Sequence, residues 1–371
     1  MIRGLIVKSV TLNNFRNYEE QTINFEKGIN VVYGKNGQGK TNILESLFMC
    51  STAKSPRTSN YKELINIDSG KNFFVINMAY NNDNLGNYIK IKYDNRIKSY
   101  VYNDILLQKT GELMTKFNSV LFTPEDLYII KGGPDQRRKF LDMFICQTNK
   151  SYFYLLQKYN RLIKQKNIFL KTQLEKAQKG TYLDVLNEYI ADVATKIVNI
   201  RYEILEKIQV AANIIQKQIT GGMEKISLDY ITVNGKLKLN LERNIYLDKL
   251  NQYKEKECVR KTCLVGPHRD DIDIKIDGME AKEYGSQGQI RTAVLSLKLS
   301  LADIIEDNNK VKPVILLDDV LSELDIFRQE AIMQKFRNNQ IIITCTDKEK
   351  IFYDQNDDIN YIFVQKGKII V

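Results

Sequence analysis

The sequence of 371 residues is poor in residues that form crosslinks or bind metals, with five cysteines and a single histidine, His268. Five cysteines in so long a chain do not form a disulfide framework. Cys258 and Cys263 lack the second pair of ligands that a zinc site needs. We therefore expect free thiols, as in the reducing cytoplasm.

Long apolar runs are also absent. No run approaches the ~18 residues that would span a bilayer. Residues 1–5 lead directly into a strand-like pattern, so no signal peptide is expected. We also find no repeats or low-complexity segments in the chain. These absences exclude a membrane-spanning protein, and we expect a soluble, cytoplasmic protein with no membrane partner.

The composition is that of a globular protein, with 43% hydrophobic and 27% charged residues. The length favours about two or three domains. A net charge of +10 favours an anionic partner such as nucleic acid. The basic residues are scattered along the chain, so the alternative is that they reflect only a lysine-rich proteome.

One short segment has a clear chemical meaning. It has the pattern G-x-x-x-x-G-K-T and lies between the apolar run 29–33 and the helical pattern of residues 42–48. Its members are Gly34, Lys35, Asn36, Gly37, Gln38, Gly39, Lys40 and Thr41. The glycines let successive amide N–H groups point at one phosphate cluster, and the helix start adds partial positive charge. Lys40, which we predict to be catalytic as well as nucleotide-binding, can reach the β- and γ-phosphates, and the Thr41 hydroxyl can ligate Mg²⁺. We predict a site for a nucleoside triphosphate; the alternative is a chance glycine-rich turn.

A second segment supplies the acidic partner of such a loop. Residues 314–319 form an apolar strand that ends in Asp318 and Asp319. A buried strand with acids at its carboxyl end is the usual neighbour of a phosphate loop. We predict that Asp318 holds Mg²⁺ opposite Thr41 and that Asp319 is catalytic, orienting or deprotonating the attacking water. The alternative is a buried strand capped by two solvated aspartates.

A third segment, residues 284–289, precedes the amphipathic helical pattern of residues 290–297. It contains Ser286, Gly288 and Gln289, a small and glycine-containing turn of the kind that binds anions at a helix start. One chain does not need two phosphate loops in one pocket. We therefore expect this turn to face the γ-phosphate held by a second copy of the protein.

The remaining patterns predict the organisation of the chain. Short strands are expected at residues 5–7, 10–12, 23–25 and 29–33, with a β-meander over 72–107. From about 135 to 220 the pattern is helical, with a break near its one glycine, Gly180. Strands are expected again at 226–230 and 272–276. The predicted domains are residues 1–133, 134–260 and 261–371.

Several motifs together resemble the ABC-type ATPases and, within them, the RecF family. They comprise residues 14–18, 57–59, 122–127, 131–134, 137–142, 266–271, 285–292 and 317–325. The resemblance covers nearly the full chain in family order. It implies an α/β fold: an ABC-type ATPase head, with a central parallel sheet carrying the phosphate loop and an antiparallel β subdomain, and an inserted compact helical lobe.

The resemblance also implies a function. It implies a weak, DNA-stimulated ATPase that dimerises on ATP and Mg²⁺, clamps duplex DNA at gapped junctions, and acts in recombination, replication restart and the SOS response. The implied partners are RecR and RecO, with RecA loaded indirectly. It further implies that Arg16 and Arg57 contact the nucleotide, although both are also consistent with ordinary surface arginines.

Two departures from the wider superfamily bear on the mechanism. Transporter-type ATPases usually have glutamate where this chain has Asp319, and the shorter carboxylate suggests slow turnover. The usual switch histidine is absent, which leaves Thr346 or Asp347 as candidates for the switch. The glutamine loop is not evident, which leaves Glu125 or Asp126 as candidates for coupling. The alternatives are a transporter ATP-binding subunit, which needs that glutamine and histidine, and a non-hydrolysing DNA binder, which Asp318 and Asp319 argue against.

Two other groups of residues are open to more than one interpretation. For His268 we favour a structural or interlobe role over a catalytic base, because the two aspartates already supply the base. The basic run 137–139 is either a contact for DNA phosphates or a solvated charge cluster at a helix start.

Overall fold

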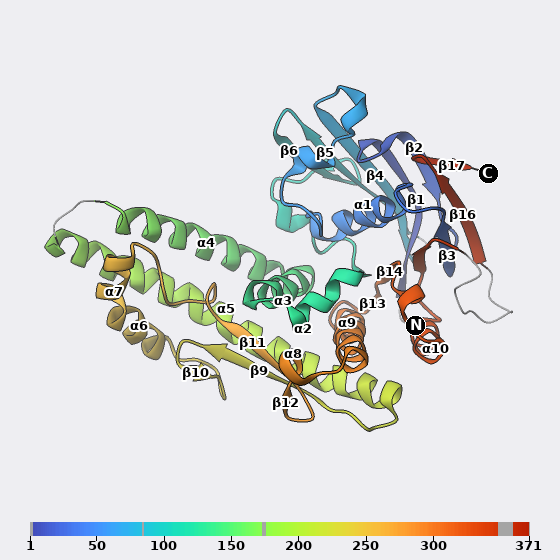
Figure 1. Ribbon diagram of the computed structural model, residues 1–371. Helices are drawn as coiled ribbons and strands as arrows, with labels where there is room; N and C mark the ends of the chain where they lie inside the picture. Colours follow the sequence, from blue (N-terminus) through green and yellow to red (C-terminus); the bar gives the residue numbers. More distant parts are fainter. Residues whose placement is uncertain (1–2, 84, 173–175, 348–358, 371) are drawn as a thin grey trace. The chain divides into compact units, whose positions relative to one another are not determined.

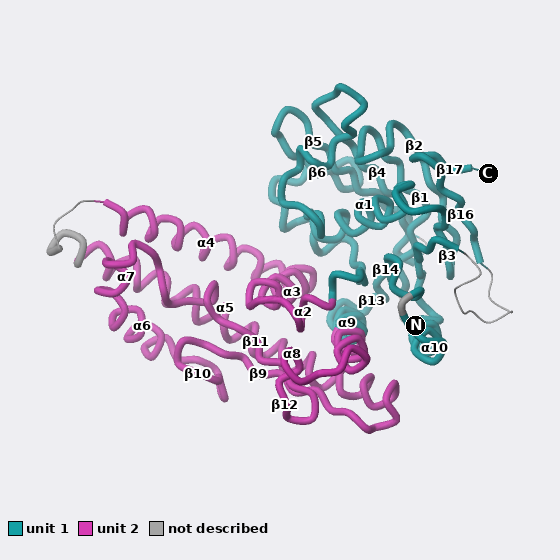
Figure 2. The backbone as a smooth tube through the Cα atoms, in the orientation of Figure 1, with its two compact units in different colours: residues 1–126, 298–371 teal, residues 127–297 magenta. Residues whose placement is uncertain are grey.

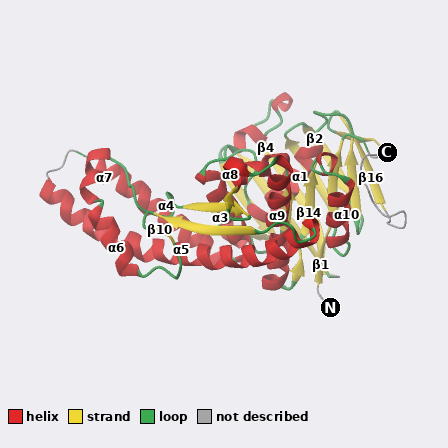
Figure 3. Ribbon diagram, turned by 60° about the horizontal axis from the view of Figure 1, so that its bottom comes forward, coloured by secondary structure: helices red, strands yellow, loops and turns green. Residues whose placement is uncertain are grey.

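The computed structural model describes residues 3–83, 85–172, 176–347 and 359–370 (Figure 1). The chain forms two compact units (Figure 2): residues 1–126 with 298–371, and residues 127–297. Strands gather mainly in the first unit and the long helices in the second (Figure 3). Residues 261–297 therefore group with the helical unit, and the three-part division at 133 and 260 stays a prediction.

The first unit is built around a largely parallel sheet of six strands in the order β17-β16-β3-β15-β14-β8. The strands are β3 (Ile29–Tyr33), β8 (Ser119–Phe122), β14 (Val314–Asp318), β15 (Ile341–Cys345), β16 (Ile359–Gln365) and β17 (Lys368–Ile370). Every residue of β8, β14 and β15 is buried, as expected for a parallel sheet covered on both faces. Helix α1 (Lys40–Thr52) packs on these three strands.

A second, mostly antiparallel sheet of seven strands completes this unit. It comprises β1 (Arg3–Phe15), β2 (Tyr18–Asn24), β4 (Phe73–Asn82), β5 (Leu85–Asp94), β6 (Ile97–Tyr102), β7 (Ile105–Leu106) and β13 (Val311–Lys312). The β-meander predicted over 72–107 is confirmed by the pairing of β4 to β7. The prediction of separate strands at 5–7 and 10–12 is wrong, because a register shift between Val7 and Ser9 lets one strand of 13 residues continue.

The second unit is mainly helical, as the sequence predicted. Its helices are α2 (Tyr128–Lys131), α3 (Pro134–Thr148), α4 (Lys150–Leu170), α5 (Lys176–Thr220), α6 (Arg243–Gln252), α7 (Lys254–Arg260) and α8 (Ala281–Tyr284). The break predicted near Gly180 is wrong, since the 45-residue helix α5 runs through that residue. One helical glycine costs only about 1 kcal/mol. The packing of α5 against α4 and α6 outweighs that cost.

A small sheet of four strands packs with these helices in the order β10-β9-β11-β12. The strands are β9 (Ile226–Thr232), β10 (Gly235–Lys236), β11 (Asp271–Ile276) and β12 (Met279–Glu280), which confirms the two strands expected there. Helix α9 (Gln287–Asn309) begins in this unit and ends in the first, where α10 (Ile326–Lys335) also lies. Short 3₁₀ helices are η1 (Tyr61–Leu64), η2 (Ile67–Ser69), η3 (Thr110–Glu112), η4 (Pro124–Leu127) and η5 (Leu321–Glu323).

Among the described residues, no helix has both the length and the apolar character needed to cross a membrane. All five cysteines lie in the described part of the chain, and none of them is in a disulfide. Cys263 is buried and its thiol contacts the Val265 carbonyl oxygen at 3.3 Å, so it serves the local fold.

Candidate nucleotide-binding site

The predicted phosphate loop connects β3 to α1, as strand, turn and helix. Two of its glycines are required by their surroundings. Gly34 has φ +150°, and a Cβ there would collide with the Val364 carbonyl oxygen of β16. Gly39 is the N-cap of α1 with φ +112°, where a Cβ would collide with the Asn17 carboxamide. The loop shape therefore depends on both the backbone freedom and the small size of glycine.

Lys40 lies inside the loop. Its ammonium donates to the carbonyl oxygens of Gly34 at 2.8 Å and Lys35 at 3.0 Å. Only 6% of the residue is exposed, and this burial lowers the lysine pKa, against the attraction of Asp319 and Asp318. The ammonium is thus held over the loop by uncharged carbonyl acceptors. A phosphate anion, which accepts hydrogen bonds more strongly, can replace them.

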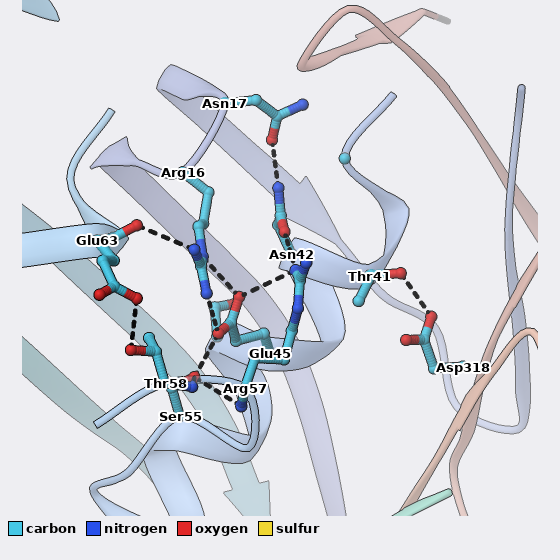
Figure 4. A network of polar contacts seen from close by, with 12 residues as sticks. Arg16, Asn17, Thr41, Asn42, Glu45, Ser55, Arg57, Thr58, Glu63 and Asp318 are labelled. Carbon is cyan, nitrogen blue, oxygen red and sulfur yellow. Dashed lines mark hydrogen bonds and ion pairs between the residues drawn. The ribbon is translucent and has the colours of Figure 1, made fainter. Parts of the chain in front are cut away.

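Thr41 and Asp318 meet across the parallel sheet. The Thr41 hydroxyl donates to Asp318 Oδ1 at 2.9 Å, although the residues are 277 positions apart (Figure 4). Strand β15 lies between β3 and β14, and all three end at the same edge. Burial raises the pKa of the Asp318 carboxyl, while the hydrogen bonds from Thr344 and Thr41 oppose that shift. The hydroxyl and carboxylate oxygens are ligands of the kind that Mg²⁺ prefers.

Asp319 follows directly and has a left-handed backbone, with φ +56°. Its N–H donates to the carbonyl oxygen of Thr344 at 3.2 Å and to Thr344 Oγ1 at 3.0 Å. The same Thr344 hydroxyl donates to Asp318 Oδ1 at 2.7 Å. One threonine therefore holds both carboxylate residues in place.

Thr344 was missed by sequence reasoning, which looked for a switch residue at Thr346 and Asp347. The feature that identifies Thr344 is the register of the sheet: β14 and β15 pair in parallel, with Thr344 opposite Asp318. Sequence alone does not show which strand lies beside which, so this partner became visible only with the sheet order.

Arg16 and Arg57 reach α1 from different loops (Figure 4). The Arg16 guanidinium donates to both oxygens of the Glu45 carboxylate, at 2.9 and 2.7 Å, and to the Glu63 carbonyl oxygen at 2.9 Å. Glu45 is 1% exposed, so Arg16 compensates a buried charge. The Arg57 side chain is 51% exposed and donates to Asn42 Oδ1 at 3.1 Å. A nucleotide contact stays a prediction for both residues.

Ser286 and Gln289 form reciprocal hydrogen bonds at the start of α9. The Ser286 N–H donates to Gln289 Oε1 at 3.0 Å, and the Gln289 N–H donates to Ser286 Oγ at 3.2 Å. This is the capping-box arrangement of a helix N-terminus. Ser286 and Gly288 are exposed. The turn therefore presents a preformed helix start to an external group, and its contact with a second copy stays a prediction.

Known proteins resemble this chain over nearly its full length. The profile of the RecF/RecN/SMC N terminal domain matches residues 6–370. The chain belongs to the RecF/RecN/SMC family. It is 39% identical to the DNA replication and repair protein RecF of Acetivibrio thermocellus, over 98% of this chain and 99% of that protein. The identity to RecF of Clostridium kluyveri is 40%, over 98% of this chain and 99% of that protein.

A solved structure of the recombination mediator protein RecF with ATP, in the RecFOR pathway, has a TM-score of 0.91 to this chain. The two are 34% identical, over 99% of this chain and 97% of that one. These relatives confirm the resemblance and the α/β ATPase-head fold. They support a replication and repair function and give no support to a transporter subunit.

Three further motifs that carry the resemblance, residues 122–127, 137–142 and 266–271, have structural contacts in this chain. Asp126 accepts from the Thr123 N–H at 2.8 Å and pairs with Lys298 at 2.9 Å. Burial raises its pKa, and Lys298 opposes that shift. Asp126 thus ties the 122–127 segment to the part of α9 in the same unit, while its coupling role stays a prediction.

His268 and Arg137 belong to the helical unit. His268 Nδ1 lies 2.5 Å from the Tyr159 hydroxyl, and burial lowers the His268 pKa to about 4. Arg137 pairs with both oxygens of Asp271 at 2.7 and 2.8 Å and is 8% exposed. Arg137 is therefore not the solvated side chain that the charge run suggested. It joins α3 to β11.

Proposed function

We propose that this protein binds ATP with Mg²⁺, hydrolyses it slowly, and dimerises on ATP to hold duplex DNA during replication and recombinational repair. The observation that carries the proposal is the hydrogen bond of 2.9 Å between Thr41 and Asp318 at the start of α1. It joins the two halves of a nucleotide site that lie far apart in sequence. The ATP-bound RecF structure supports the same assignment.

Each residue has a proposed part in the reaction. Lys40 and the loop amides bind the β- and γ-phosphates, and Thr41 with Asp318 holds Mg²⁺, which neutralises phosphate charge. Asp319 orients a water and accepts its proton while the water oxygen bonds to the γ-phosphorus. The bond from that phosphorus to the β–γ bridging oxygen breaks, and ADP and phosphate are released. Arg57 is exposed beside α1 and is the better placed of the two arginines for a nucleotide contact.

Dimerisation completes the proposal. The exposed turn of Ser286, Gly288 and Gln289 in one copy caps the γ-phosphate held by the other copy, so that two ATP molecules lie between two protomers. DNA then binds to basic groups brought together by closure, mainly through its phosphates. The net charge of +10 supports such a partner. We further propose stimulation of the ATPase by DNA, RecR and RecO as partners at gapped junctions, indirect loading of RecA, and a cytoplasmic location.

The test is retention of duplex DNA by the purified protein with and without ATP and Mg²⁺. Wild type is expected to hold DNA only with ATP, and more weakly at higher salt. Lys40→Ala removes the phosphate-binding charge and is expected to abolish the ATP-dependent part. Lys27 is an exposed lysine before β3. Lys27→Ala removes the same charge outside the loop and, as the control, should behave as wild type. Equal retention by Lys40→Ala and wild type would refute the coupling of ATP to DNA.

A further inference from the structure

Two hairpin turns contact the phosphate loop at Gln38, the residue before Gly39. The first is Arg16–Asn17, which joins β1 to β2 where Phe15 pairs with Tyr18. The second is Lys366–Gly367, which joins β16 to β17 where Gln365 pairs with Lys368. The two turns come from opposite ends of the chain and belong to different sheets of the first unit.

Gln38 is held through both of its carbonyl groups. Its backbone carbonyl oxygen accepts from Asn17 Nδ2 at 2.8 Å and from the Gly367 N–H at 3.1 Å. Its side-chain Oε1 accepts from the Lys366 N–H at 2.6 Å. Two donors, one from each turn, therefore hold the peptide carbonyl of Gln38, and a third holds its side chain.

The orientation of that unit decides where the next amide points. A trans peptide is planar, and its C=O and N–H point in opposite directions. Holding the Gln38 carbonyl toward the two turns therefore directs the Gly39 N–H away from them. We propose that Asn17 and the Lys366–Gly367 turn are positioning groups that preset the Gly39 N–H as a phosphate donor. The inference rests on the proposed binding of ATP to this loop.

The Asn17 carboxamide is itself locked in place. Its Oδ1 accepts from Asn42 Nδ2 at 2.8 Å (Figure 4). That bond leaves Asn17 Nδ2 for Gln38. The packing is also tight, because a Cβ at Gly367 would collide with the Asn17 carbonyl oxygen. Preorganisation of this kind lowers the cost of ordering the loop when the anion binds.

Binding of the non-hydrolysed analogue AMP-PNP to the full-length protein tests the proposal, in EDTA and in Mg²⁺. Asn17→Ala and Gly367→Ala are each expected to raise the Kd about tenfold, the effect of one lost hydrogen bond to a charged group. The increase should be the same without metal, because the lost donor is a backbone amide. In glycine-¹⁵N-labelled protein, the shift of the Gly39 amide signal on AMP-PNP addition should also shrink in Asn17→Ala.

Gly278→Ala is the matched control. Gly278 closes the β11–β12 hairpin with φ +80°, after Asp277 at φ +52°, much as Gly367 at φ +70° follows Lys366 at φ +48°. A Cβ at Gly278 meets no described atom within 4 Å. The control therefore carries similar backbone strain and should lower the thermal midpoint without changing the Kd.

The outcomes separate the two proposals. An unchanged Kd in Asn17→Ala, or equal changes in Gly367→Ala and Gly278→Ala, would overturn the positioning role while wild-type binding stands. Failure of wild type to bind AMP-PNP would instead refute the nucleotide site, and the positioning role with it.

Discussion

The Thr344 hydroxyl forms hydrogen bonds with both Asp318 and Asp319. It donates to the Asp318 carboxylate and accepts from the Asp319 N–H, so both of its hydrogen-bonding directions are used. Asp319 keeps a left-handed backbone that costs energy in a residue other than glycine. The hydrogen bonds that the Asp319 N–H donates to Thr344 compensate that cost. The bond that the Thr344 hydroxyl donates fixes Asp318 Oδ1, which leaves the other carboxylate oxygen for a ligand.

Thr344→Val tests this role, because it keeps the side-chain shape and removes the hydroxyl. The Mg²⁺ concentration for half-maximal ATP hydrolysis is expected to rise about tenfold, since a buried carboxylate loses a partner. The affinity of the ATP-loaded protein for Mn²⁺, measured by electron paramagnetic resonance, should fall in parallel. ATP binding in EDTA should not change. Thr344→Ser keeps the hydroxyl and should restore the wild-type values; failure of that rescue would argue against the hydrogen bonds as the cause.

At the scale of elements, the helical unit is held by buried polar contacts around Arg201 of α5. The guanidinium pairs with both oxygens of Asp142 at 2.9 Å and donates to the Tyr230 hydroxyl at 3.0 Å and the Pro267 carbonyl oxygen at 2.7 Å. These partners come from α3, β9 and the loop before β11. Residues 266–271, which the resemblance singled out, therefore connect the elements of the helical unit.

Because burial lowers the pKa of His268 in that loop, we expect the stability of the protein to depend on pH. Its pKa of about 4 in the folded protein lies below its usual value of 6.5. As pH falls from 6.5 toward 4, the unfolded chain takes up the proton first, so the stability contributed by neutral His268 is lost. The difference in free energy of unfolding between wild type and His268→Gln should therefore decrease over this range, as measured by urea titration.

Wild type must be compared with His268→Gln because the neighbouring Asp270 changes the stability with pH in the opposite direction. Burial raises the pKa of Asp270 to about 7. Its contribution is present below the usual value of 3.8 and is lost as pH rises through about 7. Asp270 remains in both proteins, so its effect cancels. A difference that stays constant from pH 7 to pH 4 would show that His268 does not titrate as its burial requires.

At the scale of the whole molecule, the proposed function depends on two copies, because it places the phosphate loop of one copy opposite the exposed Ser286 turn of the other. Asp319→Asn keeps the size of the side chain and removes the carboxylate that we propose as the proton acceptor for water. It is expected to trap an ATP-bound dimer, visible by light scattering as a doubled mass that persists. A monomer in saturating ATP and Mg²⁺ would contradict this role.

Ser286→Arg tests the other half of the proposed composite site. A long charged side chain at the start of α9 should block approach of the second copy and abolish dimerisation. ATP binding by a single copy should be unchanged, since Ser286 is expected to act on the partner's nucleotide. Nucleotide titration and light scattering on the same sample separate the two effects, and lost ATP affinity would mean that Ser286 acts within its own chain.

The sequence by itself determined the phosphate loop, the acidic strand and the β-meander, because each is a contiguous stretch with a recognisable local pattern. It also determined the family, because short motifs recur along the chain in a fixed order. Tertiary structure alone decided that Thr344 serves Asp318, that two hairpin turns hold Gln38, and that Arg137 is buried in an ion pair. Tertiary packing also keeps α5 continuous at Gly180, where the local sequence favoured a break. Such contacts depend on the order of strands and on packing between distant segments, which residue spacing does not encode.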